Sequence, residues 1–220
     1  MITNVVFSKE MFVKNVWSVQ FFLPQEEIQI NNEYRLIKIE DLVSERKESI
    51  ALTFEDYDVN YIGLENIESN TGRLVSFYPK CGTDIKSTCK KFYKNDILYG
   101  RLRPNLNKVL FADNFDSGVC TTEILVLIPN LNLVNPIYLA ELLRTTIINK
   151  RIVNMIKGAA LPRVSMSDLK QLEIPIPSLE KQNLYAEEIL RKRAELEEHI
   201  KLAQMIPVEL DQYISSAFTK

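Results

Sequence analysis

Residues 94–129 constrain the fold of this chain more than any other stretch of its sequence. The stretch contains three short apolar runs, at residues 97–99, 108–111 and 124–128. Their branched and aromatic side chains favour β-strands, and the third run stops at Pro129. The segment 100–107 joins the first two runs, and Gly100 and Pro104 within it favour a turn of fixed shape. The pattern therefore predicts a β-sheet with a rigid connecting turn.

The turn at residues 100–107 contains two arginines and two asparagines, which are Arg101, Arg103, Asn105 and Asn107. Arginine and asparagine side chains make paired hydrogen bonds with base edges, and arginine also binds phosphates. The turn therefore predicts a surface for a polyanion or for the bases of a nucleic acid. An ordinary charged hairpin loop could have the same composition, so these residues alone leave both interpretations open.

The sequence DILYGRLRPNLNKV at residues 96–109 resembles the signature of the target-recognition domain in specificity (S) subunits of type I restriction-modification systems. Four further stretches resemble the same family in the same order. They are YIGLENIE at 61–68, CTTEILV at 120–126, GAALPRVS at 158–165 and IPIPSLEKQ at 174–182. The resemblance covers about residues 34–218 and leaves the first thirty residues unmatched.

The resemblance implies an α+β fold in two parts. Residues 1–177 are expected to form a DNA target-recognition domain with a twisted, mostly antiparallel sheet and flanking helices, in which residues 1–30 are an arm packed onto the domain. Residues 178–220 are expected to form a helical arm for dimerisation and subunit docking. In this family, a full S subunit has two such domains and two long helices. It directs methyltransferase (M) and restriction (R) subunits to a split DNA site in phage defence. One domain and one helix therefore resemble half an S subunit.

Positive charge is concentrated where the resembling stretches lie. The net charge is only −2, but residues 71–163 contain 14 Lys and Arg against 6 Asp and Glu, whereas residues 26–58 contain 4 against 10. This separation favours a nucleic-acid partner for the middle of the chain. Lys86, Lys90, Lys91 and Lys94 are expected to contact DNA phosphates, and a solvated basic face is the alternative.

The turn, the lysines and the resembling stretches together give one set of expected DNA-contacting residues. The set is Lys86, Lys90, Lys91, Lys94, Tyr99, Arg101, Arg103, Asn105, Asn107, Lys108, Thr121, Thr122 and Arg163. The resemblance implies that Arg163 either lies near DNA or fixes its loop. Glu123 is expected to accept a hydrogen bond from a base or from a loop amide.

Helices are predicted on both sides of the 158–165 stretch. Asn135 and Pro136 have the preferred order of a cap followed by proline, and the apolar spacing that follows predicts one helix to about Arg151, with Arg144 on its polar side. Ser165 and Asp168 are expected to cap a short helix, and residues 172–177 to run extended. Near the start, residues 34–39 predict a strand and residues 40–47 a short exposed helix or turn.

A long helix is predicted from Ser178, because apolar positions recur at alternating spacings of three and four. They are Leu179, Gln182, Ala186, Ile189, Arg193, Leu196, Ile200 and Ala203. This heptad seam, imperfect at Gln182 and Arg193, predicts a coiled coil and an antiparallel homodimer. Arg193 is then expected to pair with a glutamate across the interface. The alternative is a helix that folds back on its own domain. Pro207 is expected to kink or break the helix.

Catalytic motifs are absent from the sequence. It has no glycine-rich cofactor loop, no P-loop and no amino-methyltransferase motif, so neither an enzyme nor a cofactor is expected. The single histidine, His199, lies among glutamates, and the three cysteines form no CxxC pair, so no metal site is expected. An odd cysteine count suits a reducing compartment, and no apolar stretch is long enough for a membrane span, so a cytoplasmic location is expected.

Two other functions fit the same sequence. The chain could be the detached recognition domain of a single-chain restriction-methylation enzyme. It could also be a coiled-coil assembly protein whose domain does not touch DNA.

Overall fold

The computed structural model describes residues 31–156 and 161–218, so the expected packing of residues 1–30 lies outside the described residues. The strands are β1 (Arg35–Lys38), β2 (Val43–Glu45), β3 (Ser49–Ile50), β4 (Asp58–Val59), β5 (Tyr61–Ile62), β6 (Lys80–Cys81), β7 (Cys89–Tyr93), β8 (Ile97–Gly100), β9 (Val109–Phe111), β10 (Ser117–Thr121), β11 (Ile124–Pro129) and β12 (Glu173–Ile176). The α-helices are α3 (Ile39–Leu42), α4 (Pro136–Arg144), α5 (Thr146–Asn154), α6 (Met166–Lys170) and α7 (Leu179–Phe218). Three short 3-10 turns are η1 (Leu64–Asn66), η2 (Gly82–Asp84) and η3 (Pro104–Leu106).

The three apolar runs of the 94–129 stretch form β8, β9 and β11 of one sheet, as predicted. This sheet has the order β2-β11-β8-β9, and a second four-stranded sheet has the order β3-β7-β10-β5. Two-stranded sheets pair β1 with β12 and β4 with β6. Every strand pair is antiparallel except β10 with β5, which confirms the expected mostly antiparallel α+β fold.

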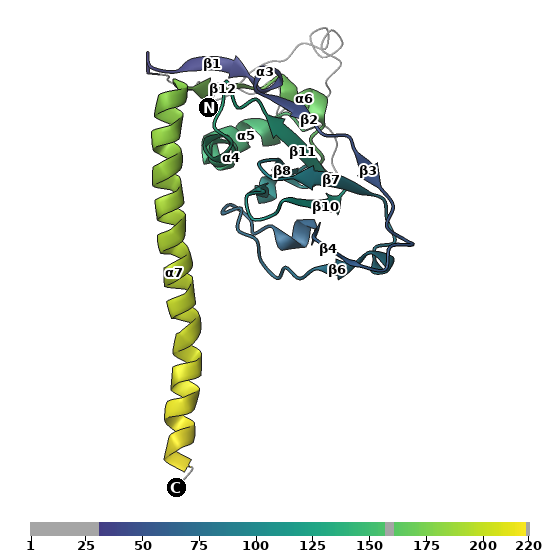
Figure 1. Cartoon of the computed structure of the whole chain (residues 1–220). Helices are drawn as coiled ribbons and strands as arrows, with labels where there is room; N and C mark the ends of the chain where they lie inside the picture. The colour runs from purple at the N-terminus through teal and green to yellow at the C-terminus, as the bar shows by residue number, and fades with distance from the viewer. Residues whose placement is uncertain (1–30, 157–160, 219–220) are drawn as a thin grey trace, which may run out of the picture.

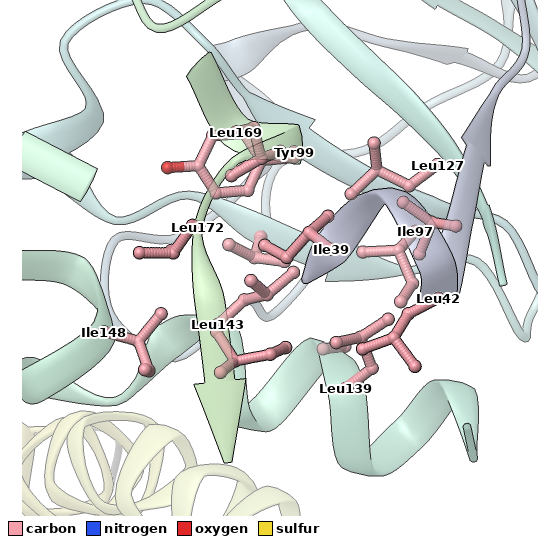
Figure 2. Packing of buried hydrophobic residues seen from close by; sticks show 14 of the residues in the cluster. Ile39, Leu42, Ile97, Tyr99, Leu127, Leu139, Leu143, Ile148, Leu169 and Leu172 are labelled. Carbon is pink, nitrogen blue, oxygen red and sulfur yellow. The ribbon is translucent and has the colours of Figure 1, made fainter. Parts of the chain in front are cut away.

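The β2-β11-β8-β9 sheet is buried on both faces, because successive side chains of a strand point to opposite faces. On one face, Leu98 and Val126 pack in a cluster with Phe92 of the second sheet. On the other face, Ile97 and Leu127 pack against the helices, where Figure 2 shows them beside Leu139, Leu143 and Leu169. The segment 97–128 therefore begins and ends on strands whose side chains are packed in the hydrophobic core.

One predicted helix, from Asn135 to about Arg151, is instead two helices, α4 and α5. The break falls at Thr145, which has extended backbone angles, φ −58° and ψ 143°. Its side chain accepts a hydrogen bond from the Ile148 backbone N–H and donates one to the Leu142 carbonyl oxygen. Threonine thus caps a new helix at this point, which the continuous apolar spacing concealed.

The predictions for the shorter elements are confirmed except at residues 40–47. Asn135 caps α4, Ser165 and Asp168 form the capping box of α6, and β12 is extended. The segment 40–47 is not an exposed helix or turn. Helix α3 buries Leu42 completely, and the chain then enters the sheet as β2.

Helix α7 begins beside the domain and then runs well past it (Figure 1). It continues through Pro207, so the expected break is absent. Its first half folds back on the domain, as the alternative to a coiled coil required. Gln182 is fully buried, Ala186 is buried, and Arg193 makes a 2.9 Å ion pair with Glu141 of α4. Burial against the domain therefore removes Gln182 and Ala186 from the exposed seam, and Arg193 pairs with Glu141 of its own chain.

Gln182 holds the N-terminal end of α7 against the domain through hydrogen bonds. Its side-chain oxygen accepts from the Asn135 backbone N–H at 2.9 Å, and its nitrogen donates to the carbonyl oxygens of Leu133 and Pro177 at 3.2 and 3.0 Å. Gln182 interrupts the apolar seam because its buried amide is hydrogen-bonded to the domain.

Replacing Gln182 with leucine should lower the free energy of unfolding by about 1–3 kcal/mol, because the buried Pro177 carbonyl oxygen and the part-buried Asn135 N–H lose their partner. Urea denaturation followed by circular dichroism measures the change. Glu187→Ala, at an exposed position of the same helix, is the control and should change little. Equal stability of the two variants would contradict the anchoring role.

The described residues contain neither a candidate membrane-spanning helix nor a candidate metal site. None of their helices is long and apolar enough to cross a membrane. Residues 31–156 and 161–218 also contain no group of three His, Cys, Asp or Glu side chains that could hold a metal ion.

Candidate nucleic-acid interface

The recognition turn, residues 100–107, has a constrained backbone. It contains the short turn η3, and the residues on either side of η3, Arg103 and Asn107, have left-handed angles with φ of 50° and 52°. Asparagine tolerates this conformation, but for arginine it costs about 1 kcal/mol. The backbone N–H of Arg103 donates to the Pro162 carbonyl oxygen at 2.8 Å, which helps to hold it there. Strain of this kind often accompanies a functional surface.

Three of the resembling stretches meet at this turn. The backbone N–H of Arg101 donates to the Glu123 carbonyl oxygen at 2.9 Å, and the Val164 N–H donates to the Arg101 carbonyl oxygen at 3.0 Å. Leu102 and Arg163 form an isolated antiparallel bridge. Stretches 96–109 and 120–126 and residues 162–164 of the 158–165 stretch are therefore brought side by side by backbone hydrogen bonds, although they are separate in sequence.

Arg163 fixes this arrangement through Glu123. The guanidinium donates to both carboxylate oxygens, with three N–O distances between 2.9 and 3.2 Å. Glu123 thus accepts from a side chain, and not from the loop amide that was one of its expected donors. The Arg163 hydrogen bonds hold the pKa of the Glu123 carboxyl below its usual range, and the charges of Arg163 and Arg101 act in the same direction. Of the two roles expected for Arg163, these contacts favour loop fixing.

The lowered pKa of Glu123 gives a pH prediction. The pair stabilises the fold fully above the ordinary carboxyl pKa, and its contribution disappears as the pH falls through the lowered pKa of the folded state. In an NMR titration, the Glu123 carboxyl carbon should titrate below the ordinary value of about 4.3. In Arg163→Gln the midpoint should rise toward that value. An unchanged midpoint in the variant would show that the pair does not form in solution.

Five expected DNA-contacting residues surround the junction and are at least partly exposed. We call them the arginine surface, and they are Arg101, Arg103, Asn105, Thr122 and Arg163. Within the described residues, the buried Nε of Arg101 has no hydrogen-bond partner, which is unusual for a buried donor. An acceptor supplied by a ligand would satisfy it. The arrangement presents the side chains of Arg101 and Arg103 on one fixed backbone frame, beside Arg163, whose guanidinium pairs with Glu123. Such a frame suits phosphate or base recognition.

Two of the expected DNA-contacting residues are buried, and the structure removes them from the surface. Tyr99 is 2% exposed and belongs to the core beside Leu169 (Figure 2). Its position in β8 points it toward the helices. Asn107 is 5% exposed, and its side-chain nitrogen donates to the Arg144 carbonyl oxygen at 2.7 Å. Asn107 therefore closes the turn from inside. Tyrosine and asparagine occur both in protein cores and at DNA interfaces, so the sequence alone could not show that these two residues are buried.

The lysines do not form one patch. Lys90 and Lys91 are consecutive in β7, so their side chains point to opposite faces of the sheet. Lys90 donates to the Ile124 carbonyl oxygen at 2.9 Å, and Lys108 donates to that of Leu64 at 2.6 Å, so both ammonium groups support the fold. Lys86 is exposed and donates to the Thr83 carbonyl oxygen.

Two further expected positions are Lys94 and Thr121. Lys94 is exposed in the turn after β7, and Thr121 is half-buried at the end of β10, next to the exposed Thr122. Lys90 and Lys108 are half-buried and bonded to backbone carbonyl oxygens, which leaves Lys86, Lys91, Lys94 and Thr121 as the candidates for DNA contact in this set.

Arg144 supports the turn and was expected on the polar side of its helix. It is 4% exposed, and its Nη1 donates to the Val109 carbonyl oxygen at 2.6 Å, while Nη2 pairs with Glu141. Its own carbonyl oxygen accepts from Asn107. Arg144 thus joins helix α4 to both ends of the segment 107–109. Its spacing of four residues from the buried Ala140 was the signal in the sequence for a buried position.

The comparison with protein-family models matches residues 31–203 to the type I restriction modification DNA specificity domain. Among curated proteins, the chain is 33% identical over 140 residues to the type I restriction enzyme HindI specificity subunit of Haemophilus influenzae, covering 61% of this chain and 29% of that protein. It is 26% identical over 163 residues to the EcoDI specificity subunit of Escherichia coli, covering 74% of this chain and 34% of that protein. The chain thus spans about a third of the length of these relatives.

Solved structures share the fold. The HsdS subunit from Thermoanaerobacter tengcongensis superposes with a TM-score of 0.65 at 21% identity, over 84% of this chain and 49% of that one. A chain from a structure of type I R-M system assembly and conformational transition gives 0.66 at 20% identity, over 88% and 50%. With the family match over most of its length, the chain belongs to the type I restriction-modification DNA specificity family.

Proposed function

We propose that this chain supplies a target-recognition domain of a sequence-specific DNA-binding specificity subunit. In this proposal residues 1–177 recognise DNA, and residues 178–220 form the arm for dimerisation and subunit docking. The chain directs methyltransferase and restriction subunits to a bipartite site, contributes no catalytic group or cofactor, and acts in the cytoplasm in defence against phage. The family membership supports the general role, and the arginine surface carries the proposal for this chain.

The observation that carries DNA binding is the convergence at one junction of Arg101, Arg103 and Arg163, from stretches up to sixty residues apart. A chance charged loop would not need a left-handed arginine held by a neighbouring segment. Nor would it leave the buried Nε of Arg101 without a partner among the described residues. Both features fit a surface built to meet an anion.

Fluorescence anisotropy with a labelled random duplex tests the proposal. Binding should weaken steeply as salt rises, because phosphate contacts release counterions. Repeated selection from the random pool should then enrich one sequence motif. A chain that binds no duplex at low salt, or binds without enriching a motif, would contradict the function.

We also propose that the chain forms an antiparallel homodimer through the distal half of α7. Exposed or half-exposed seam residues there, Leu196, Ile200 and Ala203, continue the heptad spacing around and past Glu197, which still pairs with Arg73 of the domain. The 40 residues of α7 are about 60 Å long, so pairing would set the two domains near opposite ends. Two identical domains related by a two-fold axis would read identical half-sites, so the target would be a palindrome with a non-specific spacer.

Replacing Ile200 with glutamate should convert the dimer into a monomer, because each copy would bring an unpaired charge into the seam. Light scattering at tens of micromolar measures the mass. Lys201→Glu, on a different face of the same turn, should leave the dimer intact. A wild-type monomer at that concentration would contradict homodimerisation and leave α7 as a docking arm for a catalytic subunit.

A further inference from the structure

An apolar groove lies between α4 and the first half of α7, next to β1. Its volume is about 270 Å³, and the lining residues that matter here are Tyr34, Tyr138, Leu142, Tyr185 and Ile189. The rings of Tyr138 and Tyr185 stack with centroids 5.8 Å apart, and the hydroxyls of Tyr34 and Tyr185 are hydrogen-bonded at 2.8 Å. The aromatic walls of the groove are therefore held in place.

The groove opens onto the same face of α7 as an exposed apolar stripe farther along the helix. The stripe consists of Leu196, Ile200, Ala203, Leu210, Ile214 and Phe218. With 3.6 residues per turn, Ile189 precedes Leu196 by two turns, and Tyr185 by about three. Ile214 is 54% exposed and Phe218 is 83% exposed. Groove and stripe thus form one continuous apolar face, which a second helix could cover along its whole length.

This face is complementary to itself when two copies of α7 run antiparallel. If Phe218 lies opposite Tyr185 of the other copy, the two-fold axis determines which residues face each other along the rest of the two helices. Ile189 then faces Ile214, Leu196 faces Pro207, and Ile200 faces Ala203. The same register sets Lys192 opposite Asp211, which are of opposite charge. Shifting the register by one heptad toward the C-terminus would leave the groove empty.

We propose that the groove receives the C-terminal end of α7 from a second copy of this chain, with Phe218 seated against Tyr185. The inference rests on the homodimer of the proposed function and adds its register and its end contacts. A second copy fits better than an unrelated protein, because one surface supplies both the groove and the residue that fills it. Two symmetric grooves would be filled at once, and a buried aromatic anchor at each end would stabilise the pair.

Disulfide trapping between two single-cysteine variants tests this register. In a Cys81→Ser background, which removes the half-exposed native thiol, Tyr185→Cys is mixed with Phe218→Cys and oxidised. A covalent dimer of one copy of each should form, because a disulfide requires Cβ atoms about 4 Å apart. The matched control mixes Leu184→Cys, about 100° around α7 from Tyr185, with Phe218→Cys, and it should crosslink much more slowly.

The outcomes separate this inference from the proposals on which it rests. A dimer by light scattering whose 185–218 pair crosslinks no faster than the 184–218 control would overturn the groove contact and leave the homodimer standing. A monomer that still binds duplex DNA would overturn both the contact and the homodimer but not the DNA function. Phe218→Asp gives a second readout, with dimerisation about tenfold weaker than in Ser216→Asp, which lies on the opposite face. Equal dimerisation of those two variants would also overturn the inference.

Discussion

Replacing Arg103 with alanine should weaken DNA binding by about 1–3 kcal/mol if its guanidinium contacts a base, and should relax preference at one position of the motif. Arg103 is exposed on a strained, fixed backbone, so its main chain needs no further ordering when the side chain binds. If it contacts a phosphate instead, all sequences should bind more weakly and the salt dependence should become shallower by about one unit of slope. Anisotropy at several salt concentrations distinguishes these results.

Arg101→Ala should act in the same way, and its unpartnered Nε makes it the stronger candidate for a buried contact with DNA. Arg35→Ala, exposed in β1 and outside the arginine surface, is the matched control. Unchanged binding in both Arg101→Ala and Arg103→Ala, with unchanged melting temperatures, would remove the recognition turn from the interface.

Replacing Arg144 with methionine should lower the free energy of unfolding by about 2–4 kcal/mol. The change keeps most of the side-chain volume but leaves the Val109 carbonyl oxygen without its donor in the core. Glu141 still pairs with Arg193, so part of the ionic network survives. Urea denaturation measures the loss.

The same variant should also weaken DNA binding at temperatures where it remains folded, because Arg144 supports the inner end of the recognition turn. Arg144→Lys should fall between the wild type and methionine, since one ammonium group cannot replace the arginine fork. Arg35→Met, at an exposed site, should be neutral. If Arg144→Met is as stable as Arg35→Met, the buried position contributes nothing to the fold.

Much of the fold could be predicted from the sequence, because strand runs and caps are local signals. The apolar runs of 94–129 became β8, β9 and β11, and the caps at Asn135 and Ser165 were confirmed. The helix break at Thr145 could not be predicted, since threonine at a helix interior and threonine as a cap look alike in a continuous apolar pattern. The side of α7 that faces the domain could not be predicted either, because it depends on tertiary packing.

The candidate site was predicted less completely, because composition identifies chemical groups and not their exposure. Arg101, Arg103 and Arg163 are brought together, as a DNA surface would require. Tyr99 and Asn107 had the right chemistry, but burial excludes them. Arg144 was expected on the polar side of its helix, because a long charged side chain is normally solvated. Its spacing from Ala140 was compatible with burial, but its role became clear only from its partners Val109 and Asn107.

DNA recognition by this chain is tested most directly by coexpressing it with a type I methyltransferase subunit that copurifies with it and sequencing the modified bases of the host DNA. We expect methylation at one palindromic motif with a non-specific spacer. That methylation should disappear without the chain and should weaken or change motif in Arg103→Ala. Methylation of the same motif without the chain, or none while the two proteins copurify, would contradict the assignment of specificity to this chain.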